Sequence, residues 1–449
     1  MLVNSVDQLP LGRALGEGTM DLPGKATHLE TRTHNERLVF VAIYDRGPIS
    51  RAAVARATGL TRTSVSDIVT RLISSDLVHE VGKGPSTGGK APILLETPDN
   101  ARHLIGIDLG ELAFRGAIVN LRGEILRSVE LPVEDRRGDE ALEQVFCLVD
   151  RLLRDPTRPI VGIGIGTPGL ADATTGTVVE SVNLGWRNLP LSKLLTDRVG
   201  LPVYVANDSQ ATALAEWAFG PRTSPNLVGV RIGRGVGAGV VLEGRLLQGD
   251  GFGAGEVGHT VVVEHGAPCR CGHRGCLETV ASSRAILERI AEDQPGACPA
   301  PTIEEAVAAF RRDEEPTRSI VLEAARYVGL AAAGLVGALN IRHIVLVGSV
   351  TAFGDPWLQV VRDTMRGRAL PVLAAGTSVD IGRLGDGAVV LGASALLLAQ
   401  ELGLFLASRR LPALPGAAVP VPDEGRSERG APGGGGVGVR EKAGVGGRG

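Results

Sequence analysis

Three cysteines that lie close together are the feature that most restricts how this chain can fold. Cys269, Cys271 and Cys276 stand in the run CRCGHRGC, and its two glycines let the backbone bend so that the three thiols face one centre. Zn²⁺ prefers four tetrahedral nitrogen and sulfur ligands, and His259, ten residues upstream, is the simplest fourth ligand. The spacing predicts a structural zinc site; a chance group of buried or redox-active thiols is the alternative.

Two further histidines are weaker ligand candidates. His265 follows Glu264 in an expected surface loop, and His273 lies inside the turn, from which it points back to a metal with difficulty. The other two cysteines, Cys147 and Cys298, are isolated in the sequence. This clustering argues against a disulfide framework and indicates a reducing, cytoplasmic compartment.

The residues around the cysteines resemble the signature of a known family. Gly-Glu-Val-Gly-His at 255–259, followed by CRCGHRGCLE at 269–278, is similar to the signature of the ROK family. That family comprises sugar kinases and sugar-responsive transcriptional repressors. The resemblance implies an α/β fold of the actin-like ATPase (ribonuclease H-like) type, with two lobes, from about residue 104 to 409.

Length and composition set the outer limits. With 449 residues the chain is too long for one ordinary domain, and its 43% hydrophobic but 3% aromatic content predicts a core of Ala, Val, Leu and Ile. The longest apolar stretch, 328–339, is interrupted by glycines and is too short for a bilayer. The N-terminus lacks a basic start followed by an apolar run. We therefore expect a soluble cytoplasmic protein with no membrane partner.

The pattern along the chain divides it into four parts. Residues 1–30 have no hydrophobic period and are predicted to be a flexible leader, and 411–449 form a Gly- and Pro-rich tail predicted to be disordered. Between them lie two patterned regions, 31–97 and 104–409, which meet at Pro-Asp-Asn 98–100. We expect one domain in each patterned region.

The first patterned region predicts a winged helix-turn-helix. Apolar residues at helical spacing indicate a helix around 35–44, Ser50 caps a helix at 51–58, and Thr61 caps a third at 62–75 after a Gly-Leu turn. Two short apolar runs, 77–81 and 91–95, then flank a glycine-rich basic tip and predict the wing.

The third helix of this region has the composition of a DNA-recognition helix. Hydroxyls and arginines form one face, and such side chains suit base edges and phosphates in the major groove. The region has nine Lys and Arg against six Asp and Glu, although the whole chain carries a net charge of -3. The Ser-Thr-Gly-Gly turn before a basic residue also resembles the DNA-binding end of ROK repressors. The expected DNA contacts are Arg62, Thr63, Ser64, Ser66, Arg71, Lys83 and Lys90. A winged helix used for protein contacts, or a solvated polar face, is the alternative.

The resemblance also implies two glycine-rich hairpins for nucleotide phosphates, and both are degenerate here. Sugar kinases of the family have Gly-Thr-Lys after the glycine that matches Gly110, whereas this chain has Glu111, Leu112 and Ala113. Two like charges about 4 Å apart at an effective dielectric constant of about 20 repel by about 4 kcal/mol, so ATP is not expected to bind. Further departures are Arg234 in place of Thr and Val347 in place of Gly.

The remaining hairpin residues fit two interpretations. The matched positions are Asp108, Gly110, Gly233, Gly235 and Gly237. The glycines suit either a phosphate loop or tight sheet packing, and Asp108 could equally be a strand-end carboxylate with a structural hydrogen bond.

The positions that contact sugar in the family are better preserved. They match Asn183, Asn207, Asp208, Glu256, His259 and Glu278. Carboxylates and amides bind vicinal hydroxyls in a bidentate way and so orient a pyranose. Asp208 matches the catalytic base of the kinases, and a helix N-cap is its alternative role. If His259 binds zinc through one ring nitrogen, the other is free to face the sugar.

Together these observations predict a sugar-responsive DNA-binding transcriptional regulator of carbohydrate metabolism. We expect a repressor that leaves a palindromic double-stranded DNA operator when a sugar or sugar phosphate binds, acting as a homodimer or homotetramer with structural Zn²⁺ and without ATP. One alternative is an ATP-dependent sugar kinase, with Asp208 as its catalytic base, that has gained a DNA-binding domain. Another is a winged-helix protein whose second domain only dimerises.

Overall fold

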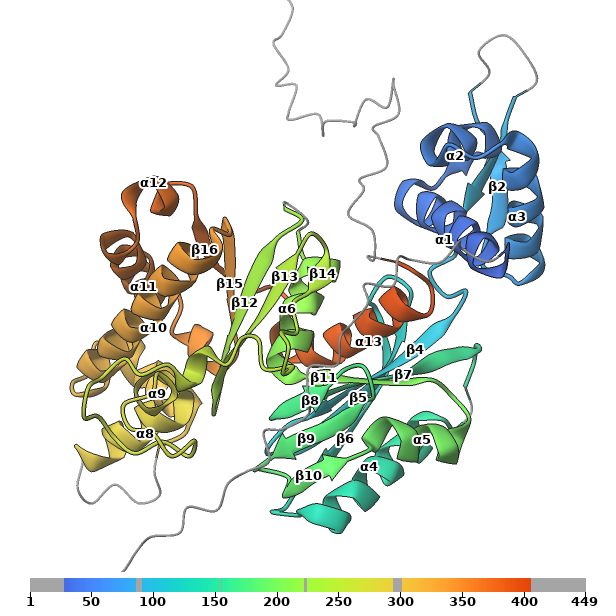
Figure 1. Cartoon of the computed structure of the whole chain (residues 1–449). Helices are drawn as coiled ribbons and strands as arrows, with labels where there is room; N and C mark the ends of the chain where they lie inside the picture. Colours follow the sequence, from blue (N-terminus) through green and yellow to red (C-terminus); the bar gives the residue numbers. More distant parts are fainter. Residues whose placement is uncertain (1–27, 86–90, 155, 222–223, 294–300, 405–449) are drawn as a thin grey trace, which may run out of the picture. The chain divides into compact units, whose positions relative to one another are not determined.

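The computed structural model describes residues 28–85, 91–154, 156–221, 224–293 and 301–404 (Figure 1). The predicted tail, most of the predicted leader, Lys90 of the predicted wing and Cys298 lie outside these residues.

The region before residue 97 consists of three helices and a three-stranded antiparallel sheet with the strand order β1-β3-β2. The elements are α1 (His28–Arg46), β1 (Ile49–Ser50), α2 (Arg51–Thr58), α3 (Arg62–Ser74), β2 (His79–Lys83) and β3 (Ile93–Glu96). The residues 51–58 predicted for the second helix are those of α2. The first helix begins about seven residues earlier than predicted, and both strands begin two residues later.

The helix starts follow the predicted capping. The Ser50 hydroxyl accepts a hydrogen bond from the amide of Ala53, and the Thr61 hydroxyl accepts one from the amide of Ser64. Between α2 and α3, Gly59 has φ 73°, a left-handed conformation that glycine adopts without strain. Local sequence therefore determines the turn between the two helices.

From residue 103 onward the chain builds two five-stranded mixed sheets. The first sheet has the order β11-β7-β4-β5-β6 and the second β14-β13-β12-β15-β16. The strands of the first are β4 (His103–Leu109), β5 (Ala113–Asn120), β6 (Ile125–Pro132), β7 (Ile160–Thr167) and β11 (Val203–Asn207). Those of the second are β12 (Leu227–Ile232), β13 (Val236–Leu242), β14 (Arg245–Leu246), β15 (His343–Val347) and β16 (Ser378–Ile381).

Helices cover both faces of each sheet. On the first sheet, α4 (Gly138–Leu152) and α5 (Leu191–Val199) bury leucines against Ile105 and Ile107, and α13 (Ala388–Gln400) packs on the other face. On the second, α6 (Asp208–Phe219) and α10 (Thr317–Leu339) take the two faces.

Glycine makes these packings close. A Cβ at Gly164 of β7 would lie 1.8 Å from the Ala393 carbonyl oxygen, and a Cβ at Gly392 of α13 would lie 1.8 Å from the Ala211 carbonyl oxygen. No larger residue fits either position without moving backbone. The helices α13 and α6 thus pack on each other as well as on the sheets.

Helix α10 is long and apolar enough, by length and composition alone, to cross a bilayer, the only such helix among the described residues. Half of its most apolar window is buried inside the protein, where it packs against the second sheet and against α11 (Asp355–Arg368). Core helices of water-soluble domains pass the same test, so its packing gives it the role of a core helix.

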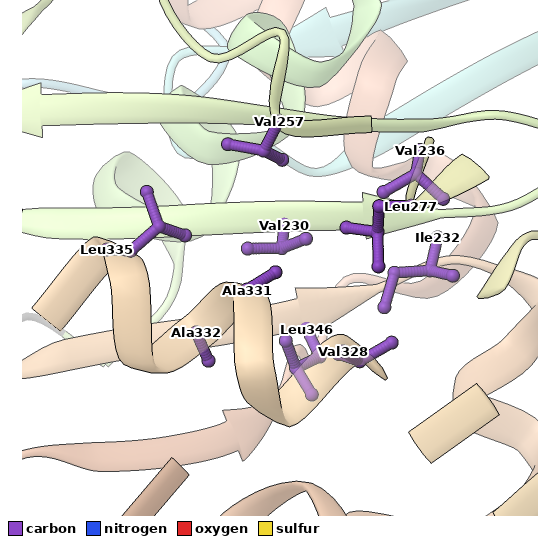
Figure 2. A pocket seen from close by; sticks show the side chains of 10 residues that line it. All are labelled: Val230, Ile232, Val236, Val257, Leu277, Val328, Ala331, Ala332, Leu335 and Leu346. Atoms are coloured by element: carbon purple, nitrogen blue, oxygen red, sulfur yellow. The ribbon is translucent and has the colours of Figure 1, made fainter. Parts of the chain in front are cut away.

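A small apolar cavity lies between α10 and the second sheet. Figure 2 shows Val328, Ala331, Ala332 and Leu335 of α10 on one side of it and residues of the sheet and of the following loops, among them Val230, on the other. Its volume is about 10 Å³, and its lining is entirely apolar. Such a space holds no well-bound water and is a local packing gap.

A small antiparallel sheet with the order β10-β9-β8 follows β7. Its strands are β8 (Leu170–Asp172), β9 (Thr177–Ser181) and β10 (Trp186–Leu189). Trp186 is buried, and its indole nitrogen donates a hydrogen bond to the Gly138 carbonyl oxygen at 2.9 Å. This bond anchors the β9–β10 turn, which carries Asn183.

Candidate functional site

The three clustered cysteines and His259 come together as predicted. One ligand atom from each of these four residues lies within 4.8 Å of every other. The Sγ atoms of Cys271 and Cys276 are 3.6 Å apart, and the Sγ of Cys269 is 3.5 Å from Nδ1 of His259. Zinc–sulfur bonds of about 2.3 Å in a tetrahedron place the sulfurs about 3.8 Å apart. The donor set therefore fits one tetrahedral metal ion.

The loop that carries the cysteines is held by backbone contacts. The amide of Cys269 donates to the His273 carbonyl oxygen at 2.7 Å, which closes the first turn. Gly275 has φ 72°, and a Cβ there would lie 1.7 Å from the Val263 carbonyl oxygen. Only glycine fits this position, so Gly275 is required for the thiols to converge.

The thiols differ in their acidity. The backbone amide of His273 is the main cause that lowers the pKa of Cys271 to about 6, whereas burial raises the pKa of Cys276 to about 12. A cation at the centre would favour the thiolate of Cys276, because metal binding requires a deprotonated sulfur. The mixture of one acidic and one buried thiol is compatible with a metal-bound set.

The two weaker histidine candidates are placed differently. The side chain of His265 is 92% exposed and lies beside Glu264. The Nδ1 of His273 lies 3.6 Å from the Sγ of Cys271, although His273 does not share the common centre of the four ligands.

His259 faces two groups at once. While its Nδ1 lies against Cys269, its Nε2 lies 3.8 Å from a carboxylate oxygen of Glu256. Burial is the main cause that raises the pKa of Glu256, and the carboxylates of Asp208 and Glu278 nearby raise it further. Three of the predicted sugar-contacting carboxylates therefore lie near one another, next to the thiol cluster.

Glu278 is engaged by the second glycine hairpin. It begins α7 (Glu278–Ala281), and its Oε2 accepts a hydrogen bond from the amide of Val236 at 3.0 Å. Its Oε1 lies 3.5 Å from the guanidinium of Arg284. A Cβ at Gly235 would come within 2.8 Å of this carboxylate, so the glycine at 235 makes room for Glu278.

The alternative role predicted for Asp208, the N-cap of the following helix, belongs to Asn207. The helix N-cap is Asn207 and not Asp208: the Oδ1 of Asn207 accepts from the amides of Ser209 and Gln210, and its Nδ2 donates to the Gly169 carbonyl oxygen. Asp208 is the first residue of α6. The physical reason is that the residue before the first helical turn, in an extended conformation, points its side chain at the free amides.

Asp208 forms a partly buried ion pair that the sequence did not predict. Its Oδ2 accepts a hydrogen bond from Nη1 of Arg231 at 2.9 Å, and its Oδ1 accepts one from the Ser209 hydroxyl at 3.1 Å. The Asp208 carboxylate is the main cause that raises the pKa of Arg231, which therefore stays charged. The signal in the sequence was a single arginine in the otherwise apolar strand β12.

Asp108 lies next to this pair. Burial raises its pKa to about 6, and the Arg231 charge opposes that rise. Its Oδ1 is buried and accepts no hydrogen bond from the described residues. Asp108, Asp208 and Arg231 thus form a group in which one cation faces two carboxyls.

A second ion pair joins the first glycine hairpin to the second. Glu111 accepts a hydrogen bond from Nε of Arg234 at 2.7 Å and lies 4.0 Å from Nη1 of Arg270. The repulsion expected from the sequence applies to a Glu111 carboxylate that faces the phosphates without a partner. Because two arginines lie beside it, the repulsion calculated from sequence is an upper bound.

Of the other hairpin glycines, Gly237 makes room for Ser209, whose Oγ would lie 2.5 Å from a Cβ at that position. A Cβ at Gly110 would come 2.9 Å from the Ala113 carbonyl oxygen, whereas Gly233 has open space around it. Tight packing thus accounts for Gly110, Gly235 and Gly237 and leaves Gly233 without a packing role.

The side chains expected to contact DNA are mostly on the exposed side of α3. Arg62, Thr63 and Ser66 are exposed, as is Lys83 on β2. Ser64 bonds to the capping hydroxyl of Thr61. Arg71 is half-buried and donates to the Asp67 carbonyl oxygen of its own helix. It also lies 3.8 Å from Glu36, a contact that joins α3 to α1.

Comparison with known proteins agrees with this geometry. The ROK family matches residues 104–400. The xylose repressor of Caldicellulosiruptor bescii is 31% identical over 395 residues, which cover 84% of this chain and 98% of the repressor. The glucokinase of Halalkalibacterium halodurans is 34% identical over 320 residues, which cover 67% of this chain and 96% of the glucokinase.

A solved structure matches over the same length as the repressor. It is the crystal structure of a ROK family transcriptional regulator, a homologue of the E. coli MLC protein. The TM-score is 0.75 with 29% sequence identity, over 84% of this chain and 98% of that chain. The match confirms the predicted α/β fold, with the mixed sheets of the actin-like sugar kinases. On the family match and the identity to these relatives, the chain belongs to the ROK family.

Proposed function

We propose that this protein is a transcriptional repressor that binds an operator through residues 31–97. It leaves the operator when a sugar binds between α6 and the metal loop, the loop of residues 269–276 that carries the three cysteines. One observation carries the proposal: the repressor relative aligns with 84% of the chain, whereas the glucokinase aligns with 67%. The ROK match covers residues 104–400, and too few residues follow it to account for the extra coverage, so the repressor alignment also reaches into the region before residue 104.

The DNA-binding half of the proposal is supported by α3 and β2. The apolar residues Val65, Ile68, Val69 and Leu72 are buried, so the opposite face of α3 is free to enter a major groove. Arg62 and Thr63 stand at its N-terminal end, where recognition helices of this type contact bases. In this proposal Lys83, which is exposed on the wing strand β2, contacts a phosphate.

The sugar half is supported by Asn183, Glu256 and His259. Glu256 and His259 lie beside the thiol cluster, Asp208 and Glu278 lie near Glu256, and Asn183 accepts a hydrogen bond from Arg270 of the metal loop. Carboxylates, an amide and an imidazole offer both acceptors and donors for vicinal hydroxyls. In this proposal the metal is structural zinc: it fixes the loop and His259, and it takes no part in chemistry. The reduced thiols that zinc needs also favour a cytoplasmic location.

The coupling we propose is allosteric. A palindromic operator is read by two copies of the N-terminal region in a homodimer or homotetramer, and the spacing of the two α3 helices must match the half-sites. Sugar that binds better to one conformation of the sensing domain shifts the population away from the DNA-binding spacing.

The experiment that tests this proposal starts from operator selection. Random duplexes enriched on the full chain give a labelled operator, and fluorescence anisotropy then measures its Kd with D-xylose, D-glucose, N-acetylglucosamine and their phosphates. One of these should raise the operator Kd by about 10-fold or more, a typical coupling energy of 1–3 kcal/mol. Selection without enrichment, or an operator Kd that no sugar changes, would contradict the proposal.

A second candidate function is ATP-dependent sugar phosphorylation, because the glucokinase relative is 34% identical and Asp208 matches the kinase base. Against it, both oxygens of Asp208 already accept hydrogen bonds, one of them from Arg231. A coupled assay with ATP and the same sugars decides the matter. Turnover that Asp208→Asn abolishes would establish a kinase.

A further inference from the structure

Arg270 is neither a predicted sugar contact nor a candidate metal ligand, yet it makes specific contacts with two other turns. It stands between the two ligand candidates Cys269 and Cys271. Its Nη1 donates a hydrogen bond to Oδ1 of Asn183 at 3.0 Å and lies 4.0 Å from Oε1 of Glu111. One side chain of the metal loop therefore reaches two turns that belong to other parts of the fold.

The two partners of Arg270 lie in turns that do not belong to the second sheet. Asn183 lies in the β9–β10 turn, and Glu111 lies in the β4–β5 turn. The loop of Arg270 follows β14 of the second sheet. The Arg270–Asn183 bond thus ties the metal loop to the turn that carries a predicted sugar contact.

The chemistry of arginine fixes which end of the Asn183 amide faces the ligand. A guanidinium has only donors, so the amide must turn its oxygen toward Arg270. The Nδ2 of Asn183 donates to no residue in the described part of the chain. Asn183 is therefore held with a free N–H pair, ready to donate to a sugar hydroxyl oxygen.

The metal loop restricts Arg270 in turn. Its backbone is fixed on both sides by ligand residues and by the bond from the Cys269 amide to the His273 carbonyl oxygen. A side chain on such a short, closed loop loses less entropy when it makes a hydrogen bond than one on an open loop.

We propose that Arg270 is a positioning residue of the sugar site, which orients the Asn183 amide so that it donates to the effector. The proposal rests on the function proposed above and adds a residue and a hydrogen-bond polarity to it. Arg270 itself touches no sugar in this account.

The test uses the full chain and the sugar that releases the operator. Arg270→Gln should weaken binding of that sugar by about tenfold, the usual size for a charge-assisted hydrogen bond at a partly exposed site. Its metal content and its operator Kd without sugar should stay those of the parent chain. Arg270→Lys, which keeps the positive charge and has only donors, should recover part of the affinity. Calorimetric titration gives each sugar Kd.

Arg274 provides the matched control. It lies in the same loop, between Cys271 and Cys276, and its side chain is exposed. Arg274→Gln removes the same charge and should leave the sugar Kd unchanged. Equal losses in the two variants would show a general charge effect and would overturn the proposal.

A double-mutant cycle with Asn183→Ala separates positioning from a merely structural role. If Arg270 acts through Asn183, Arg270→Gln has little further effect on the sugar Kd in the Asn183→Ala background. Losses that simply add would overturn the proposal while leaving the regulator function intact. If no sugar binds the parent chain, the proposed function fails first, and the role of Arg270 fails with it.

Discussion

The two groups of polar residues around α6 differ in how their charges are satisfied. On the hairpin side, Asp208 pairs with Arg231 and Glu111 pairs with Arg234, while Asp108 is buried beside the first of these pairs. On the metal side, the Glu256 side chain is half-exposed, and its carboxylate lies 3.8 Å from Nε2 of His259. In this chain, polar groups that are free to bind a ligand therefore lie mainly on the sugar side.

This difference has a physical consequence. A phosphate that entered the hairpin side would have to break ion pairs that are partly buried, and it would meet three carboxyls. A neutral sugar at the metal side would replace water on groups that are already exposed. The comparison favours a sugar sensor over a phosphoryl-transfer enzyme, and four substitutions test it.

The largest expected effect is on the metal side. Cys271→Ser removes one of the four proposed ligands and should lower zinc affinity by at least about 1,000-fold, because a serine hydroxyl does not ionise to bind Zn²⁺ at neutral pH. Mass spectrometry of the purified chain should then find little metal, and sugar binding should weaken with it. Cys147→Ser, at an exposed free cysteine, is the control. Full zinc content in Cys271→Ser would refute the ligand assignment.

The next effect is a pH dependence on the hairpin side. Burial raises the pKa of Asp108 from 3.8 to about 6, so its protonated form is favoured in the folded state. Ionisation therefore costs stability as pH rises from about 4 to 6, up to about 3 kcal/mol, and the cost is constant above pH 6. Asp108→Asn should lack this loss and should be more stable than the parent chain at pH 7.5.

Urea unfolding at several pH values measures this difference. Asp363→Asn, at an exposed carboxylate, should follow the parent chain throughout. If Asp108→Asn and the parent chain keep a constant stability difference between pH 4 and 7.5, then Asp108 does not carry the raised pKa.

A smaller effect concerns the DNA-binding face. Arg62→Ala should weaken operator binding by about 1–3 kcal/mol if Arg62 reads a base, and should weaken binding to all sequences alike if it contacts only phosphate. Anisotropy with operator and scrambled duplexes at two salt concentrations distinguishes these cases. Unchanged binding to both duplexes would remove Arg62 from the interface.

The smallest effect is expected at Glu111. Its pair with Arg234 is partly exposed, so Glu111→Gln should change stability by under about 1 kcal/mol. Because Asp108 and Asp208 remain, the substitution should not restore nucleotide binding, and thermal unfolding with millimolar Mg-ATP should be unchanged. Stabilisation of Glu111→Gln by ATP would show that this one carboxylate was the barrier.

Much of the local structure was predictable, because short segments determine it. The caps Ser50 and Thr61 and the cysteine spacing fix their neighbours within a few residues, and the structure agrees with them. The N-cap role offered as the alternative for Asp208 belongs to Asn207, because the sequence does not show which of these two residues leaves the strand first.

The ion pairs of the site were not predictable in the same way. Arg231 meets Asp208 and Arg270 meets Asn183 across 23 and 87 residues of sequence, respectively. No local pattern marks such partners, because the packing of two sheets and α6 brings them together. The charge of Glu111 was noticed, but the arginine that pairs with it was identified only as a departure from the family.

The most direct test of the central claim is thermal unfolding of the purified full chain with sugar alone, Mg-ATP alone and both together. We predict that one of D-xylose, D-glucose, N-acetylglucosamine and their phosphates raises the Tm by several degrees, as expected for about 100-fold excess over Kd, while ATP adds nothing. Stabilisation by Mg-ATP, alone or on top of the sugar, would contradict it and would make the hairpin side a working nucleotide site.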